Sequence, residues 1–573
     1  MTEHKRKEPD MHGWCGKIRV VDLESKTFED IRPDGEIYHR HIGGRGLAGY
    51  YLQDHVTRSW DDPAMPLLFF TGPLVNTDSP TSGRMTVMSR SPLTGTVGDA
   101  SVGGKLGTFM KKAGIDGLII RGKSENLCGL HITETGVTFE DAGHLKGRTV
   151  GETFHSLPKH AAAAVVGPAA ENGVLFSSVI VDRHFAAGRN GIGLVMAAKN
   201  IKFITVSGKG RTRVFDEQRL AKAKADIDRL VAASPALSGR FGISNFGTGA
   251  LYDLMDARKM MPTDNFRRTR FDAAASMNAH AYRERYQSRS KGCMGCRIQC
   301  KKVANDGRGI PEFETMSHFS ALLENTDVET VMEANRLCNE FGMDTISAAA
   351  TLSCYSEISG KRLKSPDILR LLSDMAYGRG EGAELAQGSA RYAASKNRKD
   401  ASITVKSQEL SAYDPRGALG MALSFAVSTR GACHLRAYPI AHEILRKPVA
   451  TDRFSFLGKA RMIKIGEDTN AVADSLTACK FVFFAASLEE YAQVFSAVTG
   501  VETNGQELLE KGAGIIALER AMNRANGFTK ADDDLPERFF REPGSSDANL
   551  AIRPIDRDAF LNAREAYYRV RGE

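Results

Sequence analysis

The sequence predicts an α+β protein of several domains, in which a β-rich N-terminal part precedes a mainly helical remainder. The chain has 573 residues, more than one hydrophobic core usually organises, so two or three domains are expected. Residues 14–208 contain short runs of alternating apolar and polar residues separated by turn residues, which is the pattern of strands. From about residue 216 onward, apolar residues recur at helical spacing instead.

Several runs of residues predict individual strands and helices. The clearest runs are Lys17–Asp22, Met85–Ser89 and Gly129–Thr133 for strands, and Glu217–Ala233, Val328–Phe341 and Gly505–Asn526 for helices. The Tyr413–Gly417 segment, which contains an Asp-Pro pair, interrupts the helical pattern with a turn. No short-period repeat and no low-complexity linker is present in the sequence.

Composition and charge narrow the classes of function. Hydrophobic residues make up 42% of the chain and charged residues 25%, which are ordinary values for a globular protein. The net charge of +8 comes from basic residues spread along the chain, without the arm or stripe that is typical of nucleic-acid binding, so no nucleic-acid partner is expected. A modest basic balance does suit an acidic protein partner, such as a small electron carrier.

The sequence shows no targeting or membrane segment. Met1–Asp10 is polar and lacks the apolar run of a secretory signal. The longest apolar stretches, such as Gly117–Ile120 and Phe481–Ala486, are too short to cross a bilayer. We therefore expect a cytoplasmic protein without a membrane span. In that reducing compartment the nine cysteines are too sparse for a disulfide framework, and closely spaced ones are interpreted as metal ligands.

The Lys291–Cys300 segment carries the most specific pattern. Its Cys293, Cys296 and Cys300 follow a CxxCxxxC spacing, which lets one loop supply three ligands to a [4Fe–4S] cluster. Zinc also accepts four thiolates, but its structural sites usually contain two separate CxxC pairs, and the sequence has no second pair. Radical enzymes that use S-adenosylmethionine have the reverse spacing, CxxxCxxC. Iron–sulfur is therefore favoured over zinc or free thiols.

The fourth cluster ligand has to come from elsewhere in the chain. Cys479 is the best candidate, because it follows the acidic segment that begins at Asp474 and precedes an apolar run. A buried core thiol is the alternative interpretation of a lone cysteine. We expect Cys479 to fold back beside the CxxCxxxC loop.

Eight segments, spread over essentially the whole chain, form a distinctive series. They are Gly43–Leu47, Pro80–Arg84, Ser91–Gly95, Ala186–Gly193, Cys293–Cys300, Pro311–Thr315, Tyr413–Gly417 and Asp474–Cys479. Together they resemble the aldehyde:ferredoxin oxidoreductase family of tungsten enzymes. Formate dehydrogenases also combine CxxCxxxC with a bis-pterin metal, but typically near their N-terminus. Here the cysteines follow a β-rich part, which is the order found in the aldehyde oxidoreductases.

The resemblance implies an architecture and a cofactor. Residues 1–209 would form a β-rich base for two pterins, residues 210–415 a helical domain with the CxxCxxxC ligands, and residues 416–573 a helical domain with the fourth cysteine. A tungsten (or molybdenum) ion would be held by two molybdopterins without a protein ligand. The task of the protein would then be to position and polarise the cofactor.

The matching motifs also imply cofactor contacts. Arg84 would reach the pterin near the cluster. Ser101 and Ala186 would offer backbone carbonyls to a Mg²⁺ ion that bridges the two pterin phosphates, with Ser101 replacing the usual Asn of the family. Gly103 and the Gly188–Gly193 stretch would let backbone N–H groups approach phosphate. A surface arginine and plain tight turns are the ordinary structural alternatives.

Two acidic pterin-binding motifs of the family are altered in this sequence. The residues carried over from them as pterin contacts are Asn339, Gly342, Met343, Asp344, Asp474 and Ala478. In the first motif Asn339 replaces the leading Asp, and in the second Thr477 and Ala478 replace Gly-Leu. Asn339 can still hydrogen-bond a pterin but lacks the carboxylate charge. We expect retained binding with altered tuning of one pterin.

Glu314 and His434 match the catalytic positions of the family. Oxidation of an aldehyde to an acid needs a polarised carbonyl, an oxygen from water and the removal of protons as two electrons leave. His434 would donate a hydrogen bond to the carbonyl oxygen, and Glu314 would accept a proton from the attacking water. A solvated or capping Glu and an interior His are the alternatives. Glu312 and Cys433 are neighbours that could be mistaken for these groups.

The resemblance implies an enzyme that oxidises aldehydes and passes single electrons to ferredoxin or a ferredoxin-like subunit. Reductive dearomatisation of an aromatic thioester is an alternative reaction, and an iron–sulfur relay subunit of a larger complex is an alternative role. Some family members hold an interface iron through an ExxH pair. The matching residues are Glu333 and Arg336, and arginine cannot ligate a metal. We therefore expect a homodimer or hetero-oligomer without that iron, and a Glu333–Arg336 ion pair.

Overall fold

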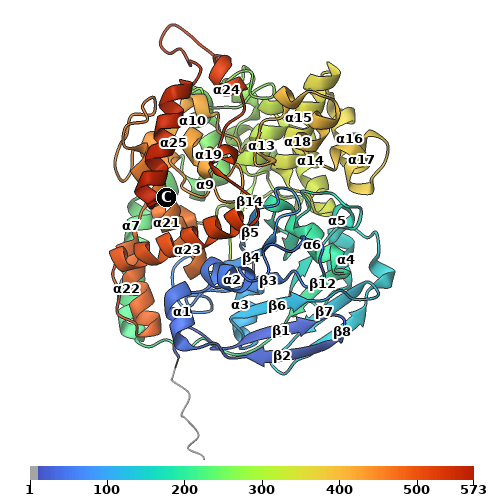
Figure 1. Ribbon diagram of the computed structural model, residues 1–573, viewed down its shortest axis with the longest axis vertical. Helices are drawn as coiled ribbons and strands as arrows, with labels where there is room; N and C mark the ends of the chain where they lie inside the picture. The colour runs from blue at the N-terminus through green and yellow to red at the C-terminus, as the bar shows by residue number, and fades with distance from the viewer. Residues whose placement is uncertain (1–10) are drawn as a thin grey trace, which may run out of the picture.

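The chain folds into a β-rich N-terminal part and a larger helical part, and the computed structural model describes residues 11–573. Met1–Asp10, where the sequence shows no secretory signal, lies outside the described residues. Strands are concentrated in residues 18–206, and helices dominate the rest (Figure 1). The expected multidomain α+β organisation is confirmed. The division at 209/210 and 415/416 stays a prediction.

Two six-stranded sheets form the N-terminal part. The first has the strand order β2(Thr27–Ile31), β1(Ile18–Asp22), β6(Gly117–Arg121), β3(Leu67–Phe70), β4(Met85–Arg90), β5(Val97–Val102). The second has the order β11(Phe185–Ala187), β10(Val179–Val181), β9(Ala162–Val165), β12(Ile201–Val206), β7(Cys128–Ile132), β8(Val137–Asp141). β1, β4 and β7 correspond to the three expected strands. Each sheet is mixed, because β1 pairs with β6, and β7 with β12, in parallel.

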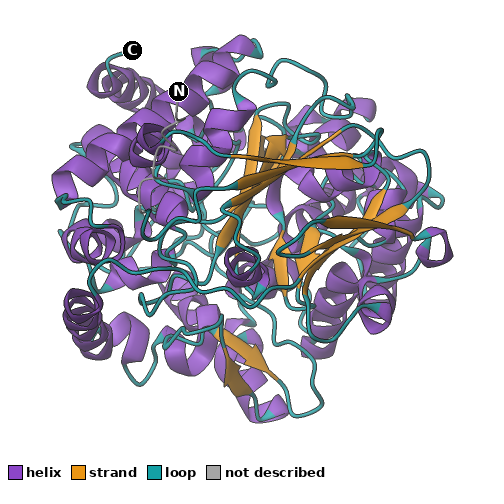
Figure 2. Cartoon of the chain, turned by 90° about the horizontal axis from the view of Figure 1, so that it is seen from below, coloured by secondary structure: helices purple, strands orange, loops and turns teal. Residues whose placement is uncertain are grey.

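The central strands bury both of their faces. In β3, Leu68 and Phe70 point into a core shared with helices, whereas Leu67 and Phe69 point into a core shared with the second sheet. Apolar residues on both faces are expected in a sheet that is covered on both sides. The edge strands β2 and β8 are largely exposed. Figure 2 shows the strands close together, with helices around them.

The helical part contains the expected helices as α7(Glu217–Ala233), α14(Val328–Phe341) and α23(Gly505–Ala525). The other long helices are α15(Thr345–Ser359), α16(Ser365–Tyr377), α21(Lys459–Leu476), α22(Leu488–Thr499) and α25(Arg557–Arg571). Two small hairpins lie among them, β13(Arg289–Lys291) with β14(Lys301–Val303) and β15(Thr404–Val405) with β16(Gln408–Glu409). No helix within residues 11–573 combines the length and the apolar character needed to cross a membrane.

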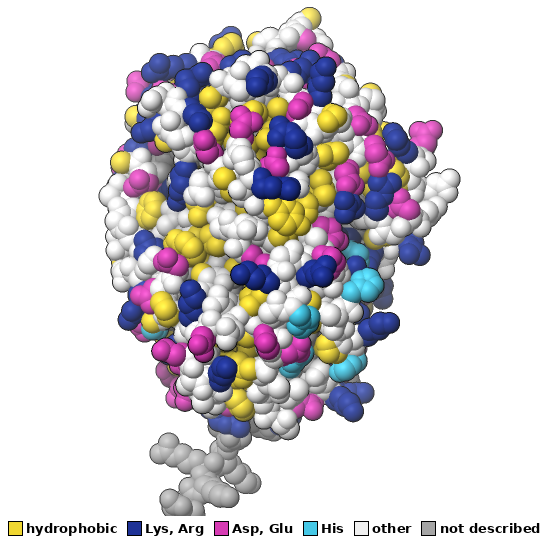
Figure 3. Space-filling view, turned by 90° about the vertical axis from the view of Figure 1, so that its right-hand side faces the viewer, with side chains coloured by type: hydrophobic (Ala, Val, Ile, Leu, Met, Phe, Trp, Pro, Cys, Tyr) yellow, Lys and Arg dark blue, Asp and Glu magenta, His cyan; other side chains and the backbone are white. Residues whose placement is uncertain are grey.

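The surface carries charge of both signs. On the face shown in Figure 3, Lys and Arg side chains are interspersed with Asp and Glu. On α14, Arg336 donates from Nη2 and Nε to Glu333 at 2.5 and 2.8 Å, so the expected ion pair is present. Whether an interface iron is missing stays a prediction.

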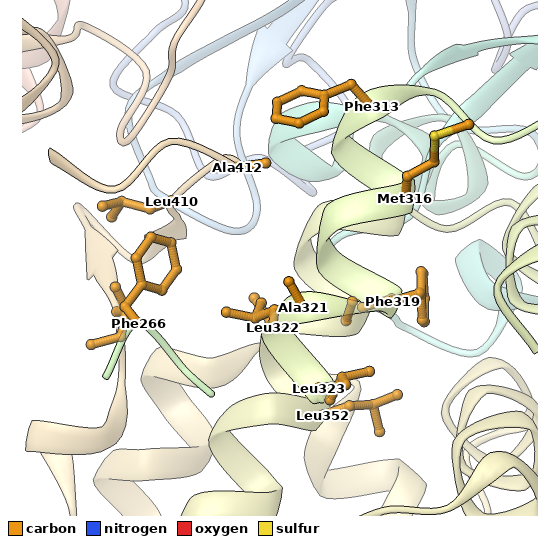
Figure 4. Packing of buried hydrophobic residues seen from close by; sticks show 14 of the residues in the cluster. Phe266, Phe313, Met316, Phe319, Ala321, Leu322, Leu323, Leu352, Leu410 and Ala412 are labelled. Atoms are coloured by element: carbon orange, nitrogen blue, oxygen red, sulfur yellow. The ribbon is translucent and has the colours of Figure 1, made fainter. Parts of the chain in front are cut away.

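A short helix, α13(Phe313–Phe319), is held by the largest hydrophobic core. The packed residues on it and beside it include Phe313, Met316, Phe319, Leu410 and Ala412 (Figure 4). The Ala412 N–H also donates to Glu314 Oε2 at 2.7 Å. Because close packing fixes the helix, the Glu314 side chain in its first turn is held in one place.

A further helix, α2(Gly44–Leu52), packs against two C-terminal helices. Gly44 has φ 37°, and a Cβ there would collide with the Asp474 carbonyl of α21, so glycine is required for this approach. Arg45 is fully buried and donates from Nε and Nη2 to Glu519 of α23 at 2.6 and 2.7 Å. A bidentate pair offsets the cost of burying both charges. The Gly43–Leu47 motif therefore joins the N-terminal part to the end of α21.

Candidate cofactor-binding and active site

The β13–β14 hairpin presents the CxxCxxxC segment in its connecting loop. The Cys296 N–H donates to the Cys293 carbonyl at 3.1 Å, and Cys300 directly precedes β14. Cys479 follows the end of α21, and its N–H donates to the Thr81 carbonyl at 3.0 Å. The remote cysteine and the loop therefore meet at the edge of the first sheet.

The four thiols lie within electrostatic reach of one another. Burial raises the pKa of Cys479 to about 11, with Cys296 and Cys293 acting in the same direction and Arg84 opposing them. Burial and Cys479 likewise raise the pKa of Cys300. Within residues 11–573, no three Cys, His, Asp or Glu side chains come close enough to hold a single metal ion. In a cubane, iron and bridging sulfide lie between the thiolates, so its ligands are spread further apart.

Two glycines let the cysteine loop approach the first sheet. A Cβ at Gly103 would lie 2.5 Å from Cys293 Sγ, and a Cβ at Gly83 would lie 3.0 Å from the Met294 carbonyl. Larger residues at these positions would push the loop away. Gly103, which was expected to approach a phosphate, thus lies against one of the proposed cluster sulfurs.

Arg84 lies beside the cysteines and points its guanidinium at Ser101 of β5. Nε donates to Ser101 Oγ at 2.9 Å, and Nη2 donates to the Ser101 carbonyl at 2.5 Å. Burial opposes the charge, but Cys479 and Cys293 raise the pKa of Arg84. The Ser101 carbonyl expected at a magnesium ion already accepts one hydrogen bond, which leaves its second lone pair. Ala186 is exposed on β11, which packs against β5.

Several side chains lie deep in the molecule and still have accessible surface, so they face an internal cavity instead of packed protein. Glu312 shows this most clearly, because protein surrounds it and its side chain is nevertheless 47% exposed. The residues of this kind are Arg84, Lys301, Glu312, Glu314, His434, Cys479 and Lys480. We infer from this that segments far apart in sequence line one cavity.

The structure brings Glu314 and His434 together in this cavity. Glu314 Oε1 lies 3.3 Å from His434 Nε2. Burial raises the pKa of Glu314 to about 8, although the Ala412 N–H stabilises its anion. Burial and the charge of Arg189 lower the pKa of His434. At neutral pH the pair is therefore uncharged, with the proton on Glu314.

Two tyrosines pack around the His434 ring. The ring centroids of Tyr413 and Tyr438 lie 5.4 and 6.0 Å from that of His434, and the two hydroxyls are 3.1 Å apart. The next residues of the Asp-Pro turn have a structural role. Arg416 is buried and donates from Nε and Nη2 to Asp414 at 2.9 and 2.7 Å. The turn is thereby fixed, and Tyr413 is held against the histidine.

Arg189 links the cavity to the first altered acidic motif. Its Nη2 donates to the carbonyls of Glu409 and Ala432 at 2.5 and 2.8 Å, and its Nε lies 3.8 Å from Asp344 Oδ2. Asp344 also caps the start of α15 by accepting backbone N–H groups. The Asp344 carboxylate is therefore positioned by a helix end and by a cation of the cavity.

The other residues of this motif make local contacts. Asn339 Nδ2 donates to the Asn335 carbonyl of its own helix at 2.7 Å. Gly342 ends α14 in the left-handed conformation, and its carbonyl accepts from the Ser178 N–H at 2.8 Å. Met343 is buried. These contacts hold α14 against the second sheet, and a role of these residues toward a pterin stays a prediction.

Asp474 is buried near the end of α21 among cations. Lys480 Nζ donates to Oδ2 at 2.7 Å, and Arg45 Nη1 lies 3.5 Å from the same oxygen. Although burial opposes ionisation, Lys480 and Arg45 hold the pKa of Asp474 below its usual value. Ala478 is buried, and its N–H donates to the Ala473 carbonyl at 2.9 Å, so it closes the helix.

The two residues that could be mistaken for catalytic groups have other partners. Glu312 lies 2.9 Å from Lys301 Nζ, and Lys301 directly follows Cys300, a proposed cluster ligand. Cys433 is buried, and its Sγ accepts from Arg430 Nη2 and Nε at 2.9 and 3.3 Å. Glu312 therefore lies beside the proposed cluster ligands, on a side of the cavity that we call the cluster side. Cys433 lies against a guanidinium.

The sequence did not identify five side chains of the site, which are Arg189, Arg430, Tyr413, Tyr438 and Lys480. Arg189 and Tyr413 belong to noted motifs, and Lys480 adjoins a proposed ligand. Arg430 and Tyr438 lie within four residues of His434 but have no motif of their own. Membership of a noted motif is the signal that could have found Arg189 and Tyr413, and a charged residue directly beside a proposed ligand is the signal that could have found Lys480.

The cavity residues fit an anionic cofactor that makes many hydrogen bonds. Arg84, Arg189 and Lys480 supply positive charge. In the part of the chain that the structure describes, Arg189 Nη1, Glu314 Oε1 and Asp474 Oδ1 are buried without a hydrogen-bond partner. Buried polar atoms are nearly always paired, so a bound polar group would satisfy these atoms.

Comparisons with known proteins identify the family. The chain matches the N-terminal domain of aldehyde ferredoxin oxidoreductase at residues 18–208, and domains 2 and 3 of the same family at residues 222–572. A tungsten-containing aldehyde ferredoxin oxidoreductase of Pyrococcus furiosus is 33% identical over 562 residues, covering 93% of this chain and 92% of the relative. The Thermococcus kodakarensis protein of the same name is 32% identical, with the same coverage.

More distant similarities carry other names. The WOR-like subunit of an aliphatic sulfonate oxidoreductase of Pyrococcus furiosus is 25% identical, covering 97% of this chain and 94% of the relative. The active-site complex BamBC of benzoyl coenzyme A reductase has a chain with the same fold, with a TM-score of 0.83, 20% identity, and coverage of 98% of this chain and 95% of that one. On the family matches and the 33% relative, this chain belongs to the aldehyde ferredoxin oxidoreductase family of oxidoreductases.

Proposed function

We propose that the chain is a tungsten (or molybdenum) bis-pterin enzyme that oxidises aldehydes to carboxylic acids and passes the electrons through a [4Fe–4S] cluster to ferredoxin or a ferredoxin-like subunit. The observation that carries the proposal is the Glu314–His434 pair, whose Oε1 and Nε2 atoms lie 3.3 Å apart. The names of the tungsten-containing relatives support the metal and the substrate class.

The paired side chains suit the proton transfers of this reaction. An aldehyde and water give a carboxylic acid, two protons and two electrons. His434 would donate a hydrogen bond to the aldehyde oxygen, with its ring held by Tyr413 and Tyr438. Glu314, once deprotonated, would accept a proton from the attacking water. Because its pKa is raised to about 8 by burial, Glu314 holds a proton at neutral pH and could return it in the reverse reaction, the reduction of an acid.

The cofactor contacts are assigned to the charged side of the cavity. The pterin-bound metal would supply the two-electron chemistry. Arg84, Arg189 and Lys480 would bind its anionic groups, and the carbonyls of Ser101 and Ala186 would bind the bridging Mg²⁺. The segments 339–344 and 474–478 would provide further pterin contacts. The proposed cluster ligands are Cys293, Cys296, Cys300 and Cys479.

Two other roles compete with aldehyde oxidation. An aromatic thioester reaction would use the same cofactors, and the likeness to the BamBC chain concerns the fold alone at 20% identity. A relay subunit without catalysis would have no need for a carboxylic acid facing an imidazole in an enclosed cavity. For that reason we rank the relay role below an enzyme.

The proposal is tested with anaerobically purified protein, a panel of aldehydes and benzyl viologen as acceptor. The wild-type protein should reduce viologen with at least one aldehyde. Joint replacement Glu314→Ala and His434→Ala should lower kcat by about 10²–10⁴-fold, the usual contribution of a positioned acid or base. Metal content must stay unchanged in the variant, which controls for misfolding. Undiminished activity of that variant would remove the catalytic assignment, and turnover of an aromatic thioester without any aldehyde activity would replace the substrate class.

A further inference from the structure

The loop of the cluster hairpin ends in an exposed apolar tip. Met294 directly follows Cys293, and its side chain is 43% exposed. Gly295 has φ 72°, and a Cβ placed there would meet no heavy atom within 4 Å. The described chain therefore leaves this side of the loop open. A molecule that contacts Met294 reaches the backbone next to a proposed cluster sulfur.

Four exposed cations surround this tip and are called the cationic rim. They are Lys105, Arg183, Arg289 and Lys291. The last two lie on β13. Lys105 lies two residues after Gly103, where a Cβ would be 2.5 Å from Cys293 Sγ. Arg183 lies two residues before Phe185, whose ring is 5.4 Å from Lys301 Nζ. The Lys105 N–H donates to the Asp182 carboxylate, next in sequence to Arg183, so the segments of these two rim residues are in contact. Three separate segments thus bring like charge to one place.

The part of the chain that the structure describes does not neutralise the rim. Within residues 11–573, none of the four rim residues takes part in an ion pair. Asp182, next in sequence to Arg183, accepts backbone N–H groups of Lys105 and Ala163. Arg297, also exposed on this loop, is paired with Asp228 at 3.3 Å and is not part of the rim.

We propose that Met294 and the cationic rim form the docking site of a small acidic protein that carries single electrons. An apolar centre inside a polar margin is the usual anatomy of a protein interface. Opposite charge on the partner would guide it to the tip. The inference rests on the proposed function, because the carrier would collect electrons from the cluster beneath the tip. Weak redox complexes have small interfaces, which suits a partner that must leave after each transfer.

The test uses the full-length protein and an acidic [4Fe–4S] ferredoxin as the probe. The rim variant carries Lys105→Glu and Arg289→Glu. The control variant carries Lys146→Glu and Lys159→Glu, two exposed lysines outside the rim, and changes the net charge equally. Ferredoxin binding is measured by calorimetry, and aldehyde-dependent reduction is measured with ferredoxin and with benzyl viologen in parallel. A second rim variant, Arg183→Glu with Lys291→Glu, is used if the first loses iron.

Docking at the rim predicts that the rim variant needs at least about tenfold more ferredoxin for half-maximal rate, while its viologen rate stays unchanged. The control variant should behave as wild type, and added salt should weaken ferredoxin binding to wild type more than to the rim variant. Equal loss in both variants, or no binding to wild type, would overturn the docking site. So would rim-dependent binding of phosphatidylserine vesicles or duplex DNA with unchanged ferredoxin binding. Ferredoxin binding that depends on the rim, without reaction of any aldehyde, would instead count against the proposed function alone.

Discussion

The two sides of the cavity differ in whether their side chains are ionised. On the cluster side, Lys301 and Glu312 form an ion pair, which lowers the pKa of Glu312 and, against the effect of burial, raises that of Lys301, and Arg84 also stays charged. The other side of the cavity contains Glu314 and His434, and we call it the substrate side. There, burial leaves Glu314 protonated and His434 neutral at pH 7. All five residues lie deep in the protein, so the charged groups beside each residue, and not depth alone, decide which of them is ionised. One side keeps fixed charge beside the cysteines of the proposed cluster, and the other keeps a proton that can move.

The largest expected effect breaks the cluster side alone. An alanine at position 103 would place its Cβ 2.5 Å from Cys293 Sγ, so Gly103→Ala should lose most of its iron. Gly514→Ala is the control, because a Cβ there meets nothing within 4 Å and its φ is not positive. Iron per chain and visible absorption are measured in both variants. Full iron content in Gly103→Ala would show that the sulfur does not lie against this glycine.

The next effect concerns the proton on the substrate side. With a Glu314 pKa of about 8, the rate of aldehyde oxidation should rise about tenfold per pH unit below that value and level off above it. In Glu314→Gln the residual rate should lose this dependence. A wild-type profile that is flat between about pH 6 and about pH 9 would contradict the assignment of Glu314 as the base.

The stability of the folded protein should fall as pH rises, whereas the rate of aldehyde oxidation should rise. The folded protein holds the Glu314 proton up to a pKa of about 8, whereas the unfolded chain releases it near 4.5. The folded state is therefore favoured at low pH, and this contribution is lost as pH rises through about 8. Between about pH 4.5 and about pH 8, the wild-type Tm should fall relative to that of Glu314→Gln. Parallel Tm curves would mean that burial does not raise this pKa.

A smaller effect concerns the midpoint potential of the proposed cluster. Glu312→Gln removes a negative charge and leaves the Lys301 cation, so the cluster should accept an electron more easily. We expect a more positive midpoint potential, by an energy on the order of 1 kcal/mol, in a redox titration followed by electron paramagnetic resonance. Glu29→Gln, on the exposed edge strand β2, should leave the potential unchanged. A shift in the negative direction would place Glu312 outside the field of the cluster.

The smallest effect concerns the support of His434. Tyr438→Phe removes the hydroxyl that lies 3.1 Å from that of Tyr413 but keeps the ring. The loss of one such hydrogen bond costs about 1 kcal/mol, so kcat should fall by less than about tenfold. A loss as large as that of His434→Ala would mean that the Tyr438 hydroxyl itself contacts substrate.

Local patterns in the sequence were sufficient to predict helices and strands, because secondary structure depends on residues that are close together in the sequence. The amphipathic runs of α7 and α14 end at the predicted residues, and the CxxCxxxC spacing marked the loop that carries the proposed cluster ligands. Pairings across the chain could not be predicted this way. Arg45 and Glu519 are 474 positions apart, and a buried lysine such as Lys480 looks like a surface lysine in sequence.

The resemblance supplied the proposed catalytic residues, but their environment came only from the packing. Glu314 and His434 were assigned from motifs, and their 3.3 Å approach depends on α13, the Asp-Pro turn and Tyr438. The Ser101 carbonyl could not be foreseen as an acceptor for Arg84, because a backbone carbonyl leaves no trace in the sequence. The geometry of backbone groups and the burial of charges are therefore what the sequence leaves undetermined.

Metal analysis of anaerobically purified protein tests the central claim most directly, which is that four cysteines from two distant segments ligate one cluster. Wild-type protein should contain about four irons per chain, as a [4Fe–4S] cluster requires, together with tungsten or molybdenum. Cys479→Ala should lose cluster iron and its absorption, whereas Cys354→Ala, at a buried cysteine of α15, should keep them. Unchanged iron in Cys479→Ala, or a wild-type protein purified without iron, would contradict the account.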